Sequence, residues 1–467
     1  MTSDIFSGLA LDGTVDTDRT ATAYAAADFG GIVSNPPLAV LRAGSISDIA
    51  AILPVAAANA IPVVPRGRGH SSLGQAQVLD GLVIDLTDLN EIRNVTDESV
   101  TVEAGATWNS LLARTLQEGL TPRVLTDYLG TSVGGTLSAG GIGGTSHRYG
   151  VQTDNVLSLD VVTADGTVRH CSPTELPDLF HATLGGFGQC GIIVRATLPL
   201  IPAPASVRRI KIFYPTVEEL ITSQRALLAE GRFDFLQGEV LPTADGWVYM
   251  LDAASYYTRP DEPDQDSLLA GLGFATSRDK VEDLGYWEFA TRLDETVTYL
   301  EGTGEWQAPH PWPNLLVPDA EIDAFTSEVM SGLEQADMGA SGLILIYPVS
   351  TAALTTPLFR KPEGSTLYLV AGLRFATDRV QADKMVSSNR RWYDVAVSLG
   401  GTSYPTGAIP FTSADWTRHL GSTRATLAEA KARFDPLGLF PRRFGHPTKA
   451  GGERTPGRLN GPAAPKQ

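Results

Sequence analysis

The first 200 residues alternate apolar runs with amphipathic or alanine-rich stretches. PLAVLRAGSISDIAAILPVAAANAIPVVPRG, residues 37–67, predicts strand, helix and strand. Ser45 or Ser47 is the expected helix cap, and Pro54 falls inside the helix, where it favours a kink. TWNSLLARTLQEG, residues 107–119, predicts an amphipathic helix that ends at a C-terminal glycine. β-Branched runs with turn residues beside them predict strands within 81–90, 99–107 and 156–171.

The pattern changes after a proline-rich stretch, LPLIPAPASVRR, which places a domain boundary near Pro202. Beyond it, strands predicted at 247–257 and 341–350 alternate with helices predicted at 216–231 and 382–401. After Tyr404 the chain returns to a loop and then to one helix over 415–434. Residues 448–467 are polar and rich in glycine and proline, which is typical of a disordered tail. This order of elements indicates a mixed α+β architecture.

Composition and charge exclude several classes of protein. With 467 residues and 43% hydrophobic residues, the chain can bury a large core, and two domains are expected. Asp and Glu number 53 against 36 Lys and Arg, a net charge of −17, which argues against nucleic acid or an anionic membrane as a partner. The start, MTSDIFSGLALDG, lacks the basic region and apolar run of a signal peptide, and no apolar segment is long enough to cross a bilayer.

The two cysteines, Cys171 and Cys190, cannot form a disulfide framework, and a reducing, cytoplasmic location is expected. Both are expected to be small buried hydrophobic residues. Cys190 stands among glycines, so a place beside a cofactor stays open for it.

Three glycine-rich loops lie in the first half of the chain. RGRGHSSLGQA begins at Arg66, where glycines let successive N–H groups converge on an anion and arginines add charge; a plain turn with two solvated arginines is the alternative. TDYLGTSVGGTLSAGGIGG begins at Thr126, and its glycine pairs indicate close approach of the backbone to a large flat ligand. LGGFGQCGIIVRA begins at Leu184. Together the loops predict a large phosphate-bearing cofactor.

His70, inside the first of these loops, has neither Cys nor Asp or Glu at metal-ligand spacing near it. A zinc site is therefore not expected, and no metal is predicted. A histidine satisfied in the core is the ordinary alternative. Its glycine-flanked place in an anion loop instead favours a chemical role with the cofactor.

These motifs, together with PHPWPNLLVP and DWTRHLG, occur in the same order as in the cytokinin dehydrogenases, FAD-linked oxidases of the vanillyl-alcohol oxidase (PCMH-type) superfamily. The resemblance covers most of residues 30–440. It implies a two-domain α+β fold, with a FAD-binding domain of residues 1–203 and 405–467 and a substrate domain of residues 204–404 inserted between them. It also implies covalent attachment of FAD through His70.

The resemblance assigns further cofactor contacts. The first loop matches the family's pyrophosphate cradle, and positions in the second and third loops match its other flavin contacts. The predicted cofactor-binding residues are Arg66, Gly67, Arg68, Gly69, His70, Ser71, Gln75, Ala76, Asp127, Ser132, Gly135, Ser138, Ile142 and Ile193. Two departures put the shape of the site over the ring in doubt: the family's C-terminal Pro-Gly-Gln is here FPRRFG, and its Tyr-Leu before the final helix is Gly407-Ala408, with Tyr404 nearby.

Two carboxylates are the catalytic candidates. Asp127 matches the family's catalytic aspartate, and beside an apolar flavin face it could accept a hydrogen bond from the substrate N–H or O–H; an N-cap or Asx-turn role is the alternative. Asp252 falls where the family has a glutamate that holds the substrate ring, and a solvated strand aspartate is equally open. Trp312, Tyr347 and Tyr404 are the predicted substrate-binding residues, although a core tryptophan is common.

The sequence therefore predicts a FAD-dependent oxidoreductase that oxidises the secondary amine of N6-isoprenoid adenines to adenine and an aldehyde. Its partners are a small-molecule substrate and an electron acceptor, oxygen or a quinone. Two alternatives stay open. One is a tailoring oxidase of an alcohol or amine in specialised metabolism, which Asp252, Gly407 and the altered C-terminus favour. The other is a flavin-binding protein without turnover, which the presence of Asp127 disfavours.

Overall fold

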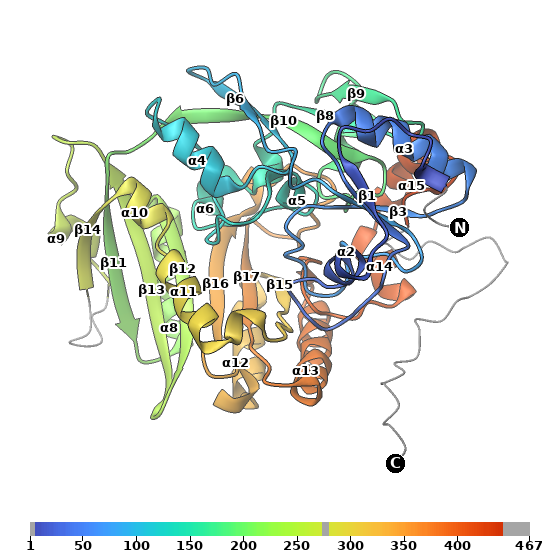
Figure 1. Cartoon of the computed structure of the whole chain (residues 1–467). Helices are drawn as coiled ribbons and strands as arrows, with labels where there is room; N and C mark the ends of the chain where they lie inside the picture. The colour runs from blue at the N-terminus through green and yellow to red at the C-terminus, as the bar shows by residue number, and fades with distance from the viewer. Residues whose placement is uncertain (1–4, 273–279, 442–467) are drawn as a thin grey trace, which may run out of the picture.

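The structure is a computed structural model that describes residues 5–272 and 280–441. It contains three sheets, which Figure 1 shows with helices around them. The first sheet has the order β1-β2-β4-β3, with β2, β4 and β3 parallel and β1 antiparallel to β2. Its strands are β1 (Thr14–Asp16), β2 (Ala39–Arg42), β3 (Val63–Arg66) and β4 (Leu82–Asp85).

The second sheet is antiparallel and has the order β5-β6-β10-β8-β9, with β7 paired to β10. Its strands are β5 (Ile92–Arg93), β6 (Ser99–Glu103), β7 (Leu120–Pro122), β8 (Ser158–Val162), β9 (Val168–Cys171) and β10 (Ile192–Pro202). The helices around these two sheets are α2 (Arg19–Ala25), α3 (Ile46–Ala58), α4 (Trp108–Leu116), α5 (Val133–Leu137), α6 (Ser146–Tyr149) and α7 (Pro177–Thr183).

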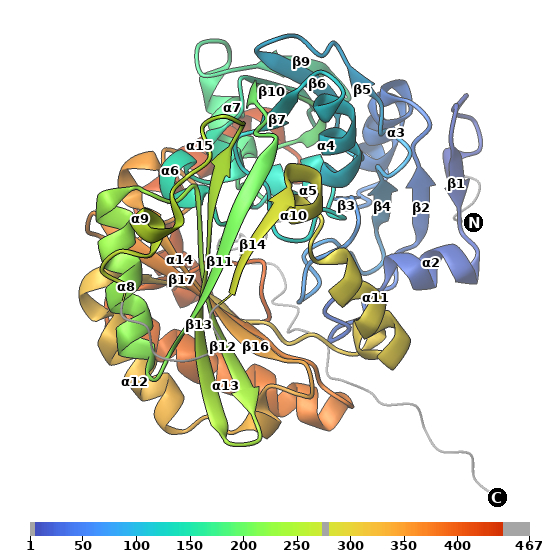
Figure 2. The same cartoon turned by 90° about the vertical axis from the view of Figure 1, so that its left-hand side faces the viewer.

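The third sheet has eight antiparallel strands in the order β14-β11-β13-β12-β16-β17-β15-β18. They are β11 (Ser206–Tyr214), β12 (Phe235–Thr243), β13 (Gly246–Tyr257), β14 (Lys280–Gly285), β15 (Asn314–Pro318), β16 (Leu343–Ser350), β17 (Thr366–Leu373) and β18 (Thr402–Ser403). Figure 2 shows helices α8 (Val217–Glu230), α12 (Ile322–Ser331) and α13 (Arg379–Ser398) on one face of this sheet. The N-terminal half of the chain lies on the other side.

Three shorter helices complete this part of the chain. They are α9 (Gln265–Leu269), α10 (Tyr286–Ala290) and α11 (Asp294–Thr303). All strands of the eight-stranded sheet fall between residues 206 and 403, inside the segment predicted as the substrate domain. The exact boundaries at 203/204 and 404/405 stay a prediction.

Local signals account for several of these elements. Ser45 caps α3 in a capping box with Asp48, so the first of the two expected cap residues is the one used. The helix continues through Pro54 to Ala58. Thr107 caps α4, and Gly119 follows that helix with a φ of 70°, as a C-terminal glycine should.

The C-terminal segment corrects one expectation. The predicted single helix over 415–434 is two helices, α14 (Ser413–Leu420) and α15 (Thr423–Phe434). Gly421 separates them with a φ of 49°, a conformation that breaks a helix and that glycine adopts readily. The predicted tail at 448–467 and all but the first two residues of FPRRFG lie outside the described residues.

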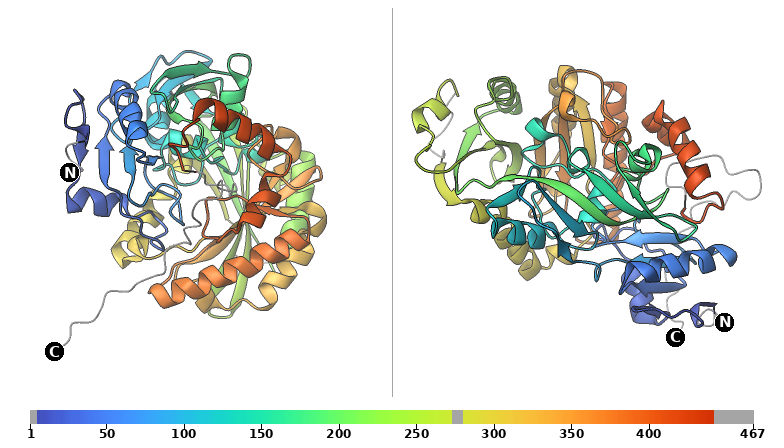
Figure 3. Two further views of the ribbon diagram at one scale, coloured as in Figure 1. Left: turned by 90° about the vertical axis from the view of Figure 1, so that its right-hand side faces the viewer. Right: turned by 90° about the horizontal axis from the view of Figure 1, so that it is seen from above.

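The end of the chain packs back on its beginning. Figure 3 shows the red C-terminal helices against the N-terminal half, and α15 contacts α7. Leu427, Phe434 and Phe440 belong to the same apolar core as the β2–β4 sheet. Among the described residues, none of the helices combines the length and the apolar character that a bilayer span requires.

Lys431 joins this C-terminal segment to the third glycine-rich loop through buried polar contacts. Its buried ammonium donates to the Gln189 carbonyl in the third glycine-rich loop (2.7 Å) and to the Phe440 carbonyl (2.6 Å), and pairs with the buried Asp435 carboxylate (2.5 Å). On the same helix, Arg433 pairs with Asp178 at the surface, where the arginine side chain is 59% exposed. Because one ion pair is buried and the other is solvated, we expect them to contribute differently to the free energy of unfolding.

We expect Lys431→Met to lower the free energy of unfolding by about 3–5 kcal/mol, because it leaves the Asp435 carboxylate buried without its cation. Arg433→Met, the matched control on the same helix, should cost less than about 1 kcal/mol, because its pair is solvated. Urea unfolding followed by circular dichroism checks both values. Equal, small losses in the two variants would show that the buried pair does not hold the C-terminal segment in place.

Candidate functional site

The three glycine-rich loops meet the eight-stranded sheet at one cavity of about 310 Å³. Every predicted cofactor- or substrate-binding residue lines it, from all three loops and from the far segments that carry Trp312, Tyr347 and Tyr404. Other lining residues are Pro65, Ser72, Leu86, Ala104, Thr126, Tyr128, Thr131, Gly134, Thr136, Ala139, Gly141, Phe187, Gly188, Asn314, Leu345, Leu369, Ala371, Leu373 and Thr406. Asp252 is the one predicted site residue that the structure places elsewhere.

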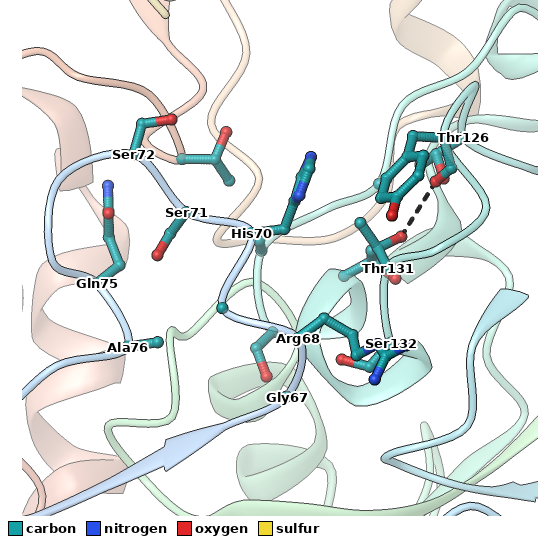
Figure 4. A pocket seen from close by; sticks show the side chains of 18 of the residues that line it. Gly67, Arg68, His70, Ser71, Ser72, Gln75, Ala76, Thr126, Thr131 and Ser132 are labelled. Atoms are coloured by element: carbon teal, nitrogen blue, oxygen red, sulfur yellow. Dashed lines mark hydrogen bonds between the residues drawn. The ribbon is translucent and has the colours of Figure 1, made fainter. Parts of the chain in front are cut away.

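The first loop leaves β3 at Arg66 and curves along one side of the cavity (Figure 4). The Arg66 guanidinium turns away and donates to the Ala27 carbonyl at 2.7 Å, while Arg68 remains exposed. Gly69 has a φ of 66°, and a Cβ there would lie 2.3 Å from the Arg66 guanidinium. This loop therefore presents backbone and the Arg68 cation to the cavity, and uses Arg66 to hold its own shape.

Glycine also lets the first and second loops approach each other. A Cβ on Gly67 would lie 2.0 Å from the Ser132 Oγ, a contact that no side chain can make. Part of the glycine pattern has a different cause from the one expected. A Cβ on Gly143 would meet the Leu125 carbonyl at 1.9 Å, and one on Gly144 would meet the Phe235 ring at 2.2 Å. Those two glycines serve packing within the protein rather than the approach of a ligand.

His70 lies in a stack of rings. The Phe29 ring is 4.0 Å from its ring on one side, and the Tyr128 ring is 5.0 Å away. The Phe29 N–H donates to the Gly69 carbonyl and the Gly30 N–H to the Ser71 carbonyl, so the backbone on both sides of His70 is fixed. Burial, with a smaller effect from His310, lowers the pKa of His70 to about 3. The imidazole is therefore neutral at physiological pH and keeps a nitrogen lone pair.

Asp127 presents its carboxylate to the same cavity, between two donors from the other half of the chain. The Arg292 guanidinium donates to Oδ1 at 2.5 Å, and the Tyr347 hydroxyl donates to Oδ2. Burial and the nearby Asp127 charge raise the pKa of Tyr347 well above its ordinary value, so this hydroxyl stays a donor. Asp127 also borders a second, smaller cavity of about 60 Å³ with Arg292. Both donors come from segments that lie outside the sequence motifs.

Asp252 lies farther from the cavity than Asp127, on strand β13 of the eight-stranded sheet. Its carboxylate is fully buried and accepts from the Arg209 Nε at 2.9 Å and from Nη2 at 2.5 Å. It does not line the cavity, because β12 lies between its strand β13 and β16, which carries Tyr347. This position does not support the predicted contact with a substrate ring. Glu239 is an acid on the intervening strand β12. Burial and the Asp252 charge raise the pKa of Glu239 to about 7.

The opposite wall of the cavity is a largely apolar part of the eight-stranded sheet. Leu345 on β16 pairs with Ala371 on β17, and Tyr347 pairs with Leu369, so all four side chains share one face. Trp312 borders this wall, and its indole N–H donates to the Arg374 carbonyl at 2.9 Å. An apolar face of this kind suits a flat ring or an aliphatic arm.

The segment that departs from the resemblance closes the cavity near the first loop. Gln75 Nε2 donates to the carbonyls of Pro405 (3.2 Å) and Gly407 (3.3 Å), so it joins the two segments. A Cβ on Gly407 would lie 2.4 Å from the Trp312 carbonyl, which explains glycine there by packing. Tyr404 lines the cavity, and its hydroxyl accepts from the Gly141 N–H at 3.0 Å.

Sequence reasoning missed Arg292, Phe29 and His310. His310 lies inside the motif PHPWPNLLVP, and its ring stacks on Phe29 at 3.9 Å. Neither Arg292 nor Phe29 has a local signal beyond a charge or an aromatic ring in an ordinary segment. Only the tertiary fold brings them to Asp127 and His70.

The lining of the cavity suits a flavin dinucleotide, because it has two unlike parts. One part offers loop backbone and the Arg68 cation, which suit phosphates. The other offers the apolar sheet face with the Asp127 carboxylate at its border, which suits a flat ring and a substrate beside it.

Comparison with known proteins decides the family. A family model for the FAD binding domain matches residues 37–172, and one described as cytokinin dehydrogenase 1, FAD and cytokinin binding matches residues 240–442. Cytokinin dehydrogenase 7 of Oryza sativa subsp. japonica is 34% identical over 93% of this chain and 91% of its own. This chain belongs to the cytokinin dehydrogenase family.

Two further relatives bear on the fold and activity. An uncharacterized oxidoreductase, ORF5 in the fasciation locus of Rhodococcoides fascians, is 40% identical over 92% of this chain and 98% of its own. The solved structure of 6-hydroxy-D-nicotine oxidase from Arthrobacter nicotinovorans superposes with a TM-score of 0.73 at 21% identity, covering 92% of this chain and 97% of that one. The latter likeness shows the fold.

These comparisons confirm the two-domain PCMH-type fold and the flavoprotein class. This member of the cytokinin dehydrogenase family is a FAD-dependent oxidoreductase, and its FAD-binding and cytokinin-binding domains imply a small-molecule substrate. The roles of the individual cavity residues remain predictions.

We expect Gly67→Ala to reduce the FAD content of the purified protein to less than about a tenth. The new Cβ would lie 2.0 Å from the Ser132 Oγ and 3.0 Å from its Cβ, so the first two loops would still be too close after the hydroxyl rotates away. Gly302→Ala is the matched control, since a Cβ there meets nothing within 4 Å. Flavin absorbance per protein measures the content. Full loading of Gly67→Ala would show that this close approach is not required for the cofactor.

Proposed function

We propose that this protein oxidises the secondary amine of N6-isoprenoid adenines, with FAD attached covalently through His70. The observation that best supports the proposal is the position of Asp127 in the cavity. Its carboxylate and the neutral imidazole of His70 line one cavity, opposite an apolar sheet face. Membership of the cytokinin dehydrogenase family supports this choice of substrate.

The proposed reaction divides its electrons and protons between cofactor and protein. Bound FAD supplies a hydride acceptor, N5 of the ring. The substrate carbon next to the amine loses a hydride, and the amine loses its proton to the Asp127 carboxylate, so a C=N bond forms. Asp127 accepts a hydrogen bond from the N–H and orients that carbon. Water then adds to the imine, which gives adenine and an aldehyde. Oxygen or a quinone completes the turnover as electron acceptor.

The cavity walls suit such a substrate. Leu345, Leu369 and Ala371 offer apolar surface for an isoprenoid arm, and Trp312 offers an aromatic face for the purine. Tyr347 lies between these walls and Asp127, and its hydroxyl is already committed to the carboxylate. The residues therefore bind and orient the substrate.

One observation favours a second candidate, a tailoring oxidase of an alcohol or amine. Asp252, expected to hold the substrate ring, is committed to Arg209 and does not reach the cavity. A purine in the cavity would therefore lack the predicted hydrogen bond from its ring N–H to Asp252. A substrate without a ring N–H would not need that hydrogen bond. The experiment below separates the two candidates.

We expect isopentenyladenine to reduce the flavin of the purified protein without oxygen, with release of about one adenine per flavin. Stopped-flow absorbance and chromatography measure the two. Asp127→Asn keeps the shape and removes the charged acceptor, so reduction should slow on the order of a hundredfold with flavin content unchanged. If isopentenyladenine leaves the flavin oxidised while another alcohol or amine reduces it, the second candidate replaces the first.

The covalent bond has its own test. Acid precipitation of the wild-type protein should leave the flavin in the pellet, and His70→Ala should release it to the supernatant. His170→Ala, which alters an imidazole with an exposed side chain that is hydrogen-bonded to Asp160, should retain it. Release from the wild-type protein would exclude attachment through His70, while non-covalent binding in the same cavity would survive.

A further inference from the structure

Among the described residues, Arg292 forms one ion pair, with the carboxylate of Asp127. It lies in the short link between α10 and α11, and its side chain is 10% exposed. Its Nη2 donates to Asp127 Oδ1, and its Nη1 donates to the Phe289 carbonyl at 3.2 Å. Burial by itself would lower the pKa of Arg292, but the charges of Asp127 and, less closely, Asp252 raise it.

Two aromatic rings pack against this guanidinium. Its central carbon lies 4.7 Å from the ring centre of Phe235 on β12 and 4.7 Å from that of Phe289 on α10. These rings pack edge to face at 5.1 Å, so they form a corner around the cation. Gly144 admits the Phe235 ring, because a Cβ there would overlap it. Cation–π contacts with both rings restrict the movement of the guanidinium.

The carboxylate of Asp127 is thereby held at both oxygens. Arg292 binds Oδ1 and Tyr347 binds Oδ2, from α10–α11 and from β16. A carboxylate oxygen has two acceptor positions, so each oxygen keeps one for another donor. Asp127 lines both cavities, whereas Arg292 lines the small one and not the large one. Arg292 therefore holds the carboxylate without occupying the large cavity.

We propose that Arg292 is the positioning residue of the reaction: it fixes the Asp127 carboxylate so that a free acceptor position faces the substrate N–H or O–H. This proposal rests on the function proposed above, because the reaction is the one described there. It extends that function to Arg292, a residue outside the sequence motifs. Arg292 does not touch the substrate cavity, so it acts through Asp127 alone.

The structure supplies a matched pair of arginines for the test. Arg209 is also part-buried, also lies near the Phe289 ring (5.9 Å), and also pairs with a carboxylate, that of Asp252. Its carboxylate does not line the cavity. Replacing either arginine with lysine keeps the charge and removes the planar fork that fixes a carboxylate. Only the change at Arg292 should therefore affect the chemistry.

The measurement separates binding from reduction by anaerobic stopped flow with isopentenyladenine. We expect Arg292→Lys to slow flavin reduction about tenfold and Arg292→Ala about a hundredfold, the scale on which a misplaced catalytic group costs rate. The substrate dissociation constant should change less than threefold in both. Arg209→Lys should stay within about twofold of wild type. Guanidinium chloride below denaturing concentration should restore part of the rate of Arg292→Ala, and methylammonium chloride should not.

Crystal structures give a readout that needs no substrate. In Arg292→Ala, or in Arg292→Lys if the alanine variant does not fold, the Asp127 side chain should leave its wild-type rotamer. An unchanged rotamer, or equal slowing by Arg209→Lys and Arg292→Lys, would overturn the proposal. If isopentenyladenine fails to reduce the wild-type flavin, the proposed substrate is wrong, and the Asp127 rotamer in the variant still decides the role of Arg292.

Discussion

The contact between Asp127 and Arg292 joins residues 165 positions apart and sets the geometry on which the site depends. Asp127 belongs to the N-terminal half, with the loops that resemble a cofactor cradle. Arg292 and Tyr347 belong to the segment that forms the eight-stranded sheet. A buried carboxylate is costly unless it is paired and hydrogen-bonded, so these donors also bind the two halves together. The cavity lies where this requirement brings the halves into contact.

The second constraint is the close approach of backbone to backbone around the cavity. Gly67 and Ser132 nearly touch, and Phe29 and Gly30 hold the backbone on both sides of His70. Such contacts satisfy buried N–H and carbonyl groups in loops that have no regular structure of their own. The glycines in these loops therefore have two causes. Some face the cavity, and others, such as Gly143 and Gly144, only let the protein close on itself.

The sequence predicted the local elements and the lining of the cavity well, because both follow from short-range signals. Ser45 and Gly119 mark helix ends through their own chemistry, and the glycine motifs fix loops that each carry several lining residues. The prediction of a single helix at 415–434 was wrong because a glycine such as Gly421 can also occur inside a helix. The sequence therefore did not indicate a break there. In the structure Gly421 has a φ of 49°, which ends the first helix.

Sheet order explains why the sequence could not rank its acidic residues. Asp252 pairs with Gln237 across β12 and β13, and Glu239 pairs with Leu345 across β12 and β16, so these side chains share the face that borders the cavity. How far each side chain lies from the cavity depends on the number of strands between the side chain and the cavity. The pattern of residues within one strand does not reveal the order of the strands in the sheet.

The partners of these acids then decide what each one does. Asp127 and Asp252 each meet an arginine, whereas Glu239 accepts from the neutral Gln237 amide at 2.9 Å. Burial therefore raises the pKa of Glu239 to about 7, with the Asp252 charge adding to the effect. Residue type is the same or nearly the same at all three positions. The place of each acid in the fold, rather than the carboxylate itself, makes Asp127 the one of the three that lines the large cavity.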